Sequence, residues 1–231
     1  FSDDLFILLL AYFCAQTFAS ALLCFFTIRR LGNRHVDPEV VPLGKHLSIM
    51  GVFFALASNS LDIILWHFIG PAAVAMFAFA NRPPQELRRV FTEAFPIALP
   101  KFSQRSKEEI QRTLLPKIAK LYWVLIPAVL VYVLVAPYVF QWLFPQYFEA
   151  VLYSQVLSFT ILFAPLSLFG SVFQALGRTR ELYITSITSP ALLIPALIFG
   201  AWQFGLWGVI VVWYIVQTMG TILVLYLFKR M

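Results

Sequence analysis

The sequence is poor in charge. Only 12% of its 231 residues are Asp, Glu, Lys or Arg, whereas about 25% is ordinary for a globular domain. Apolar residues make up 61%, and the mean hydropathy is +0.82. A water-soluble fold of this size would lack the charged side chains that cover its surface. The composition therefore excludes a cytosolic enzyme, a secreted disulfide scaffold and a disordered tail, and it predicts an integral membrane protein.

Cysteine and histidine are scarce as well. Cys14 and Cys24 lie in one apolar stretch, about 15 Å apart along a helix, which is too far for a disulfide between them. The three histidines do not cluster, and the sequence has no metal-ligand spacing, phosphate-binding loop or nucleophile motif. We therefore expect no catalytic residues, no metal site and no enzyme activity. The net charge of +6 indicates contact with anionic lipid heads, and we expect no nucleic-acid partner.

Long stretches free of Asp, Glu, Lys and Arg are present instead, and a membrane-spanning helix needs about 20 mostly apolar residues. Four such stretches are 5–28, 121–148, 150–177 and 182–228. The last is long enough for two helices joined by a hairpin at Gly200–Gly208. A further pair of spans, at about 46–67 and from about 72, turns at Gly70-Pro71. The sequence thus predicts an all-α protein with seven transmembrane helices.

Basic residues predict the orientation, because they collect in cytoplasmic loops. All 17 Lys and Arg residues fall between spans one and two, from mid-span three to the start of span four, between spans five and six, or after span seven. The three opposite connections have none, and the amino terminus opens with Asp3 and Asp4. We therefore expect the N-terminus outside and the C-terminus inside, in a cell membrane of the inner or plasma type.

Charge inside the spans indicates function. Asp62 lies roughly 10–12 Å from the outer turn by helical rise, and a carboxylate at a span's centre costs about 2.5–3.5 kcal/mol. Arg82 follows the same turn by about eleven residues, near mid-bilayer. One interpretation is a functional polar cavity that both residues line. The alternative is a buried Asp62–Arg82 pair that only locks two helices together.

Further polar residues extend the predicted cavity. Glu86, Arg89 and Glu93 follow Arg82 at steps of four, three and four, which puts all four on one helix face. Asn59 lies close to Asp62, and the fifth span has a polar face that includes Gln174. We expect a cavity open mainly toward the cytoplasm and lined by the second, third and fifth spans. Its expected residues are Arg82, Asn59, Glu86, Arg89, Gln174 and Asp62.

Two other features complete the prediction. Prolines interrupt the third to sixth spans, and each interior proline removes a helix hydrogen bond, which is tolerable where neighbouring helices or a wet cavity satisfy the freed carbonyl. The segment at about 101–120 is interpreted as a basic interfacial helix between the third and fourth spans. The Arg88/Arg89 pair is interpreted as a cytoplasmic anchor.

Several short motifs, in order, resemble one family of transporters. They are Ser60-Leu61-Asp62, Phe68-Ile69-Gly70-Pro71-Ala72-Ala73-Val74-Ala75, Phe77-Ala78-Phe79-Ala80, Ala98-Leu99-Pro100, Phe144-Pro145-Gln146-Tyr147, Gln174-Ala175-Leu176-Gly177-Arg178-Thr179-Arg180 and Gly205-Leu206-Trp207-Gly208. Over residues 43–230 the chain resembles polysaccharide flippases of the O-antigen or lipid-linked oligosaccharide type. These belong to the multidrug/oligosaccharidyl-lipid/polysaccharide exporter superfamily.

The resemblance implies a V-shaped transporter made of two six-helix bundles. Residues 43–231 would be the C-terminal bundle, and 1–42 the last helix of the preceding bundle with its linker, so the chain is expected to be part of a longer protein. Such proteins flip a polyprenyl-pyrophosphate-linked oligosaccharide by alternating access, for lipopolysaccharide or other surface polysaccharide synthesis. By analogy Arg82 contacts the pyrophosphate, and Asp62 gates the site or binds a coupling Na⁺ or H⁺.

The implied partners are the lipid-linked oligosaccharide, membrane lipids and the missing N-terminal bundle, with a polysaccharide polymerase or glycosyltransferases as further candidates. No other cofactor is expected. Two alternatives stay open. A cation-coupled multidrug exporter of the same superfamily would use acidic residues in the membrane, but the predicted cavity is more cationic than acidic. A non-transporting membrane assembly subunit would move neither lipid-linked sugar nor drug.

Overall fold

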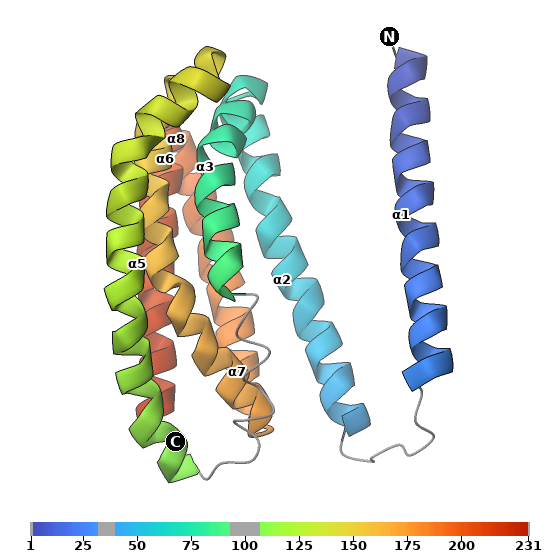
Figure 1. The fold of residues 1–231 in the computed structure, drawn as a ribbon, viewed down its shortest axis with the longest axis vertical. Helices are drawn as coiled ribbons and strands as arrows, with labels where there is room; N and C mark the ends of the chain where they lie inside the picture. The colour runs from blue at the N-terminus through green and yellow to red at the C-terminus, as the bar shows by residue number, and fades with distance from the viewer. Residues whose placement is uncertain (1, 32–39, 93–106, 231) are drawn as a thin grey trace. The chain divides into compact units, whose positions relative to one another are not determined.

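The computed structural model describes residues 2–31, 40–92 and 107–230, and none of the residues in these ranges forms a strand (Figure 1). The predicted all-α class is confirmed. Five of the described helices are long and apolar enough to cross a membrane, which fits a membrane protein, while the count of seven spans and their orientation stay predictions. The chain divides into two units, Phe1–Gly44 and Lys45–Met231, each described by itself.

The first unit is dominated by α1 (Ser2–Leu31), which contains the predicted first span. Its sequence is apolar on every side, as suits a helix surrounded by lipid or protein. Its last turn carries Arg29 and Arg30, and the Arg29 guanidinium lies 5.8 Å from the centre of the Phe25 ring. Basic residues at a helix C-terminus interact favourably with the helix dipole.

The second unit begins within α2 (Val40–Phe68) and continues with α3 (Pro71–Thr92). Gly70 separates the two helices with a φ of +113°, a conformation that glycine adopts without strain. Its N–H donates to the carbonyl of Leu65 at 3.0 Å and so closes α2. Pro71 starts α3, where a missing N–H costs nothing. The turn predicted at Gly70-Pro71 is confirmed.

The helix α5 (Lys107–Leu143) corrects the prediction of a separate interfacial helix at 101–120. Residues 101–106 lie outside the described residues, but 107–120 continue without a break into the fourth predicted span. The reason is an apolar stripe at helical spacing, in which Ile110, Leu114 and Ile118 are buried against residues of two later helices. A helix lying on the membrane surface would turn such a stripe toward the lipid, whereas here other helices cover it.

The fifth predicted span is a composite. After the short 3₁₀ turn η2 (Pro145–Tyr147), it comprises α6 (Ala150–Ser158), the 3₁₀ segment η3 (Phe159–Leu166) and α7 (Ser167–Ala175). Pro165 lies inside η3. The composite packs between α3 and α5 on one side and α8 on the other. It is the most buried span, with 56% of its most apolar window buried.

The last element, α8 (Thr179–Arg230), folds back on itself at Gly205, whose φ is +60°. Each arm is about 25 residues long, enough to cross a bilayer. The arms touch at Gly200 and Gly208, where a Cβ on Gly208 would collide with the carbonyl oxygen of Gly200. The predicted hairpin at Gly200–Gly208 is confirmed, and it depends on glycine at both contact positions.

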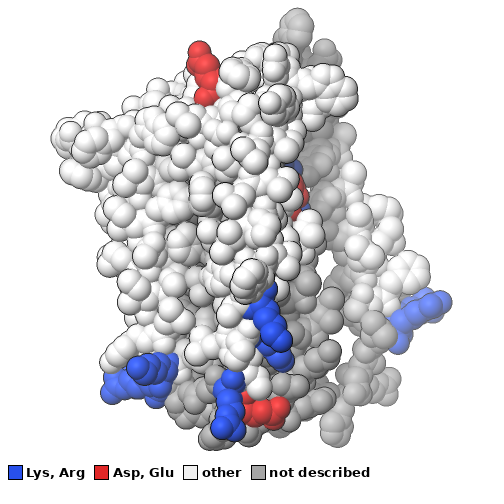
Figure 2. Space-filling model, turned by 60° about the vertical axis from the view of Figure 1, so that its left-hand side comes forward, with Lys and Arg blue, Asp and Glu red and all other residues white. Residues whose placement is uncertain are grey.

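Three apolar clusters hold the second unit together. One joins α2, α3, α5, α6 and the turn of α8, with Leu65, Phe77 and Leu157 almost fully buried. A second joins α2, α5, α7 and both ends of α8, where the ring centre of Phe169 lies 4.7 Å from that of Phe228. A third, smaller cluster joins α5 to η3. On the face drawn in Figure 2, the blue Lys and Arg side chains gather toward the lower end beneath a largely uncharged surface. An uncharged band of this kind is what lipid tails require.

Candidate functional site

The two predicted site residues of α2 are both exposed. Asn59 donates from Nδ2 to the carbonyl of Ala55 at 2.7 Å, within its own helix. Asp62 is exposed, and none of the residues in 40–92 or 107–230 forms an ion pair with it. Arg82 is exposed as well. The described residues therefore do not form the buried Asp62–Arg82 pair considered as an alternative.

The predicted residues of α3 share one face, as their spacing indicated. Arg82 pairs with Glu86, its Nε lying 3.4 Å from Oε1, and their side chains are 74% and 49% exposed. Arg89 is exposed on the next turn, and Glu93 lies outside the described residues. Because exposed i,i+4 pairs contribute only about 0.3–0.5 kcal/mol, this pairing does little to hold the fold together. The outward face of α3 is charged and has no structural role that these contacts reveal.

Gln174 lies near the end of α7 and is half-buried. Its side chain forms no hydrogen bond with the charged residues of α3 among the described residues, and neither does that of Asn59. The structure thus brings Arg82, Glu86 and Arg89 together, and among the described residues it gives Asn59, Asp62 and Gln174 no hydrogen bond or ion pair to them.

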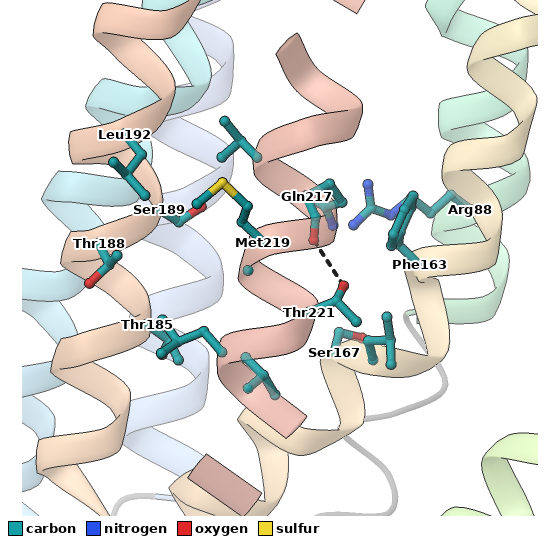
Figure 3. A pocket seen from close by; sticks show the side chains of 15 residues that line it. Arg88, Phe163, Ser167, Thr185, Thr188, Ser189, Leu192, Gln217, Met219 and Thr221 are labelled. Carbon is teal, nitrogen blue, oxygen red and sulfur yellow. Dashed lines mark hydrogen bonds between the residues drawn. The ribbon is translucent and has the colours of Figure 1, made fainter. Parts of the chain in front are cut away.

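A cavity of about 350 Å³ lies elsewhere in the second unit, and Arg88 points into it (Figure 3). We call it the Arg88 cavity. Its walls come from α3, from η3 and the start of α7, and from both arms of α8. The lining residues are Arg88, Phe163, Leu166, Ser167, Thr185, Thr188, Ser189, Leu192, Val216, Gln217, Met219, Gly220, Thr221, Leu223 and Val224. None of the six predicted site residues is among them, and α2 contributes none.

Arg88 reaches the interior because it lies on the apolar face of α3. Phe77, Ala80 and Pro84 are buried at steps of three and four, and Arg88 comes four residues after Pro84. Side chains at that spacing lie on one side of a helix. Leu87, beside Arg88, packs against the cluster formed by Leu125, Val129 and Ile161. Arg88 is therefore half-buried and lines a cavity, whereas Arg89, one position further, is exposed. The interpretation of this pair as a cytoplasmic anchor stays a prediction.

The polar groups around Arg88 fall into two kinds. The hydroxyls of Ser167, Thr185 and Thr221 donate to backbone carbonyls three or four residues earlier in the chain at 2.7–3.0 Å. The side chains of Ser189 and Gln217 form no hydrogen bond with any residue in the described ranges, so they keep free donors. Figure 3 shows the Arg88 guanidinium pointing toward Gln217 on the second arm of α8.

The charge of the cavity is positive. Arg88 is the one charged residue among the fifteen that line it, and it forms no ion pair within the described residues. Eight lining residues are apolar or glycine, so the wall opposite the guanidinium is largely hydrocarbon. This combination of a single cation, free neutral donors and an apolar wall suits an anionic group attached to an apolar body.

The sequence carried a signal for Arg88 that the prediction did not use. Helical spacing between charged residues indicates Arg82, Glu86 and Arg89. The apolar stripe of Phe77, Ala80 and Pro84, in contrast, continues to Arg88. Ser189 and Gln217 gave no such signal, because each is a lone polar residue in a long apolar run.

Comparison with known proteins identifies no relative: no family model, no curated protein and no solved structure matches the chain.

Proposed function

We propose that this chain is part of a membrane transporter that flips a polyprenyl-pyrophosphate-linked oligosaccharide from the cytoplasmic to the outer leaflet for surface polysaccharide synthesis. The observation that carries the proposal is the exposed charged face of α3, formed by Arg82, Glu86 and Arg89. Arg82 follows Pro71 by about 16 Å of helix, roughly half the thickness of a hydrocarbon core.

Charge at that depth is costly in lipid. Each exposed guanidinium or carboxylate at mid-membrane costs about 2.5–3.5 kcal/mol on insertion scales. The face must therefore be covered by water or by protein, and a water-filled translocation path satisfies this requirement. Among the described residues this face carries two arginines and one glutamate. That positive balance favours an anionic cargo such as a pyrophosphate, with which guanidinium forms paired hydrogen bonds.

The resemblance of the hairpin around Gly70-Pro71 to polysaccharide flippases supports the same assignment. In this proposal residues 43–231 act as one of two bundles, and the charged face of α3 lines the path between them. Arg82 contacts the pyrophosphate, while Glu86 holds Arg82 extended and Arg89 offers a second contact nearer the cytoplasm. Asn59 and Asp62 on α2 border the same path.

The test replaces Arg82 in the intact protein and measures surface polysaccharide. Arg82→Ala should abolish the polymer while leaving the amount of protein in the membrane unchanged, and Arg82→Lys should retain part of it. Arg180→Ala removes an exposed arginine at the start of α8 and serves as the control, with polymer near the wild-type level. Wild-type polymer in Arg82→Ala would remove Arg82 from the mechanism.

The cation-coupled exporter is a second candidate, because Asp62 is an exposed acid at membrane depth without an ion pair among the described residues. It is separated from the first by transport in proteoliposomes that contain the intact protein. A flippase moves a labelled lipid-linked oligosaccharide without an added cation gradient or with one, but it does not move dyes. Cation-stimulated dye efflux that Asp62→Asn abolishes would favour the exporter.

A further inference from the structure

We propose that the Arg88 cavity binds the phosphate group of an acidic membrane lipid. The inference does not rest on the proposed function, because it concerns a site inside one unit and its test measures binding rather than transport. It concerns none of the residues assigned to the translocation path.

The charge of the Arg88 guanidinium favours an anionic ligand. A guanidinium stays protonated at any physiological pH, and Arg88 lies among apolar helices about 25 Å along α3 from Pro71. No acidic residue lines the cavity, so the protein itself supplies no neutralising partner there within the described residues. A bound anion would offset the cost of placing this charge among apolar spans.

The cavity wall also contains hydrogen-bond donors that have no partner among the described residues. The Gln217 amide and the Ser189 hydroxyl belong to opposite arms of α8 and have no hydrogen-bond partner among the described residues. Gln217 faces the Arg88 fork, while Ser189 lines the cavity from the first arm, beside Met219 (Figure 3). A tetrahedral phosphate accepts several hydrogen bonds at once, and arginine binds it in a bidentate way. A cation would find no acidic ligand in this wall.

The volume and the apolar lining of the Arg88 cavity suit a lipid phosphate. Ligand pockets commonly measure about 300–1,000 Å³, and the Arg88 cavity is near the lower end at about 350 Å³. It can take a phosphate with its attached glycerol, but an oligosaccharide would not fit. Leucine, methionine and valine side chains make up much of the remaining wall. They suit the start of a lipid chain and would serve no purpose for a free inorganic ion.

The experiment measures thermal unfolding of the purified, delipidated full chain in neutral detergent. Dioleoylphosphatidylglycerol is the probe, dioleoylphosphatidylcholine is the zwitterionic comparison, and sodium phosphate tests the free anion. Phosphatidylglycerol should raise the unfolding temperature of the wild type in a saturable way, with a much smaller rise from phosphatidylcholine. In Arg88→Gln the concentration giving half the rise should increase about tenfold or more, since hydrogen bonds to charged groups are lost.

One control and a second test variant complete the design. Arg180→Gln removes an exposed arginine outside the cavity and should respond to phosphatidylglycerol as the wild type does. Gln217→Leu keeps the charge, and its half-effect concentration should rise severalfold, since one neutral hydrogen bond is lost. This variant carries the test even if Arg88→Gln does not fold.

The outcomes separate cleanly. An unchanged phosphatidylglycerol response in Arg88→Gln, or in Gln217→Leu when Arg88→Gln cannot be purified, overturns the site. An equal response to phosphatidylcholine overturns its preference for an acidic lipid. A saturable response to sodium phosphate that depends on Arg88 and matches that of the lipid overturns the assignment to a lipid. Loss of transport in Arg82→Ala, or its absence, has no bearing on any of these results.

Discussion

Two proline-containing spans of this protein differ in backbone geometry. The helix α5 stays continuous through Pro116, Pro127 and Pro137, whereas the span made of α6, η3 and α7 changes to 3₁₀ geometry over the eight residues around Pro165. In the most apolar window of α5 only 22% of residues are buried, against 56% in the composite span. Lipid offers no hydrogen bonds, so irregular backbone is tolerated where protein surrounds it. The comparison shows that burial, more than proline content, decides where a span departs from the α-helix.

Each of the two spans also donates a hydrogen bond to a carbonyl that a proline leaves unpaired in the other span. In α5, Pro137 cannot donate to the carbonyl of Val133, and the side chain of Gln155 on α6 donates to that carbonyl at 2.8 Å. In η3, Pro165 cannot donate to the carbonyl of Leu162, three residues earlier as 3₁₀ geometry requires, and the hydroxyl of Tyr122 on α5 donates there at 2.9 Å. The exchange helps to shape the Arg88 cavity, because η3 and the start of α7 form one of its walls.

The largest expected effect tests the difference in burial. Phe169 on α7 is fully buried against Phe228, and Phe169→Ala should lower the free energy of unfolding by about 3 kcal/mol through a cavity in the packing. Leu134→Ala on α5 removes a side chain that is 71% exposed and should change it by less than about 0.5 kcal/mol. Unfolding in SDS titrations measures both. Equal losses would mean that α5 is as tightly packed as α7.

A smaller effect is expected from removing the hydrogen bond that Tyr122 donates to η3. Tyr122→Phe removes only the hydroxyl and leaves the Leu162 carbonyl without its donor, which should cost about 1–2 kcal/mol. The matched control is Tyr138→Phe on the same helix, because Tyr138 is 72% exposed and forms no hydrogen bond among the described residues. The same titrations should show no change for the control. A neutral Tyr122→Phe would mean that lipid, water or a backbone shift satisfies the carbonyl equally well.

The sequence predicted the helices and their turns far better than their internal geometry. Apolar length marks a span because the bilayer imposes it, and glycine marks the turns at Gly70 and Gly205 because both need a positive φ. The 3₁₀ segment could not be predicted from Pro165, since three prolines in α5 leave a continuous helix. Whether a proline breaks a span depends on side chains such as Tyr122, which lie far away in the sequence.

The residues of the candidate site likewise fall into those that the sequence predicted and those that it did not. Helical spacing correctly put Arg82, Glu86 and Arg89 on one face, because that depends on α3 alone. It failed for Arg88, since whether a helix face meets lipid or protein depends on which helices cover it. Here the covering comes from α8, about one hundred residues later. The polar residues Ser189 and Gln217 acquire meaning only through that packing.

The smallest expected effect tests whether Gln155 replaces the hydrogen bond that Pro137 cannot make. Gln155→Leu should cost about 1 kcal/mol of unfolding free energy, because the Val133 carbonyl loses its donor. In the background of Pro137→Ala the new N–H reaches the same carbonyl, so the cost of Gln155→Leu should fall to nearly zero. Pro127→Ala supplies an N–H to a different carbonyl and should leave the cost unchanged. A double-mutant cycle measures the coupling, and strict additivity with Pro137→Ala would show that the Gln155 contact is not a repair of the proline.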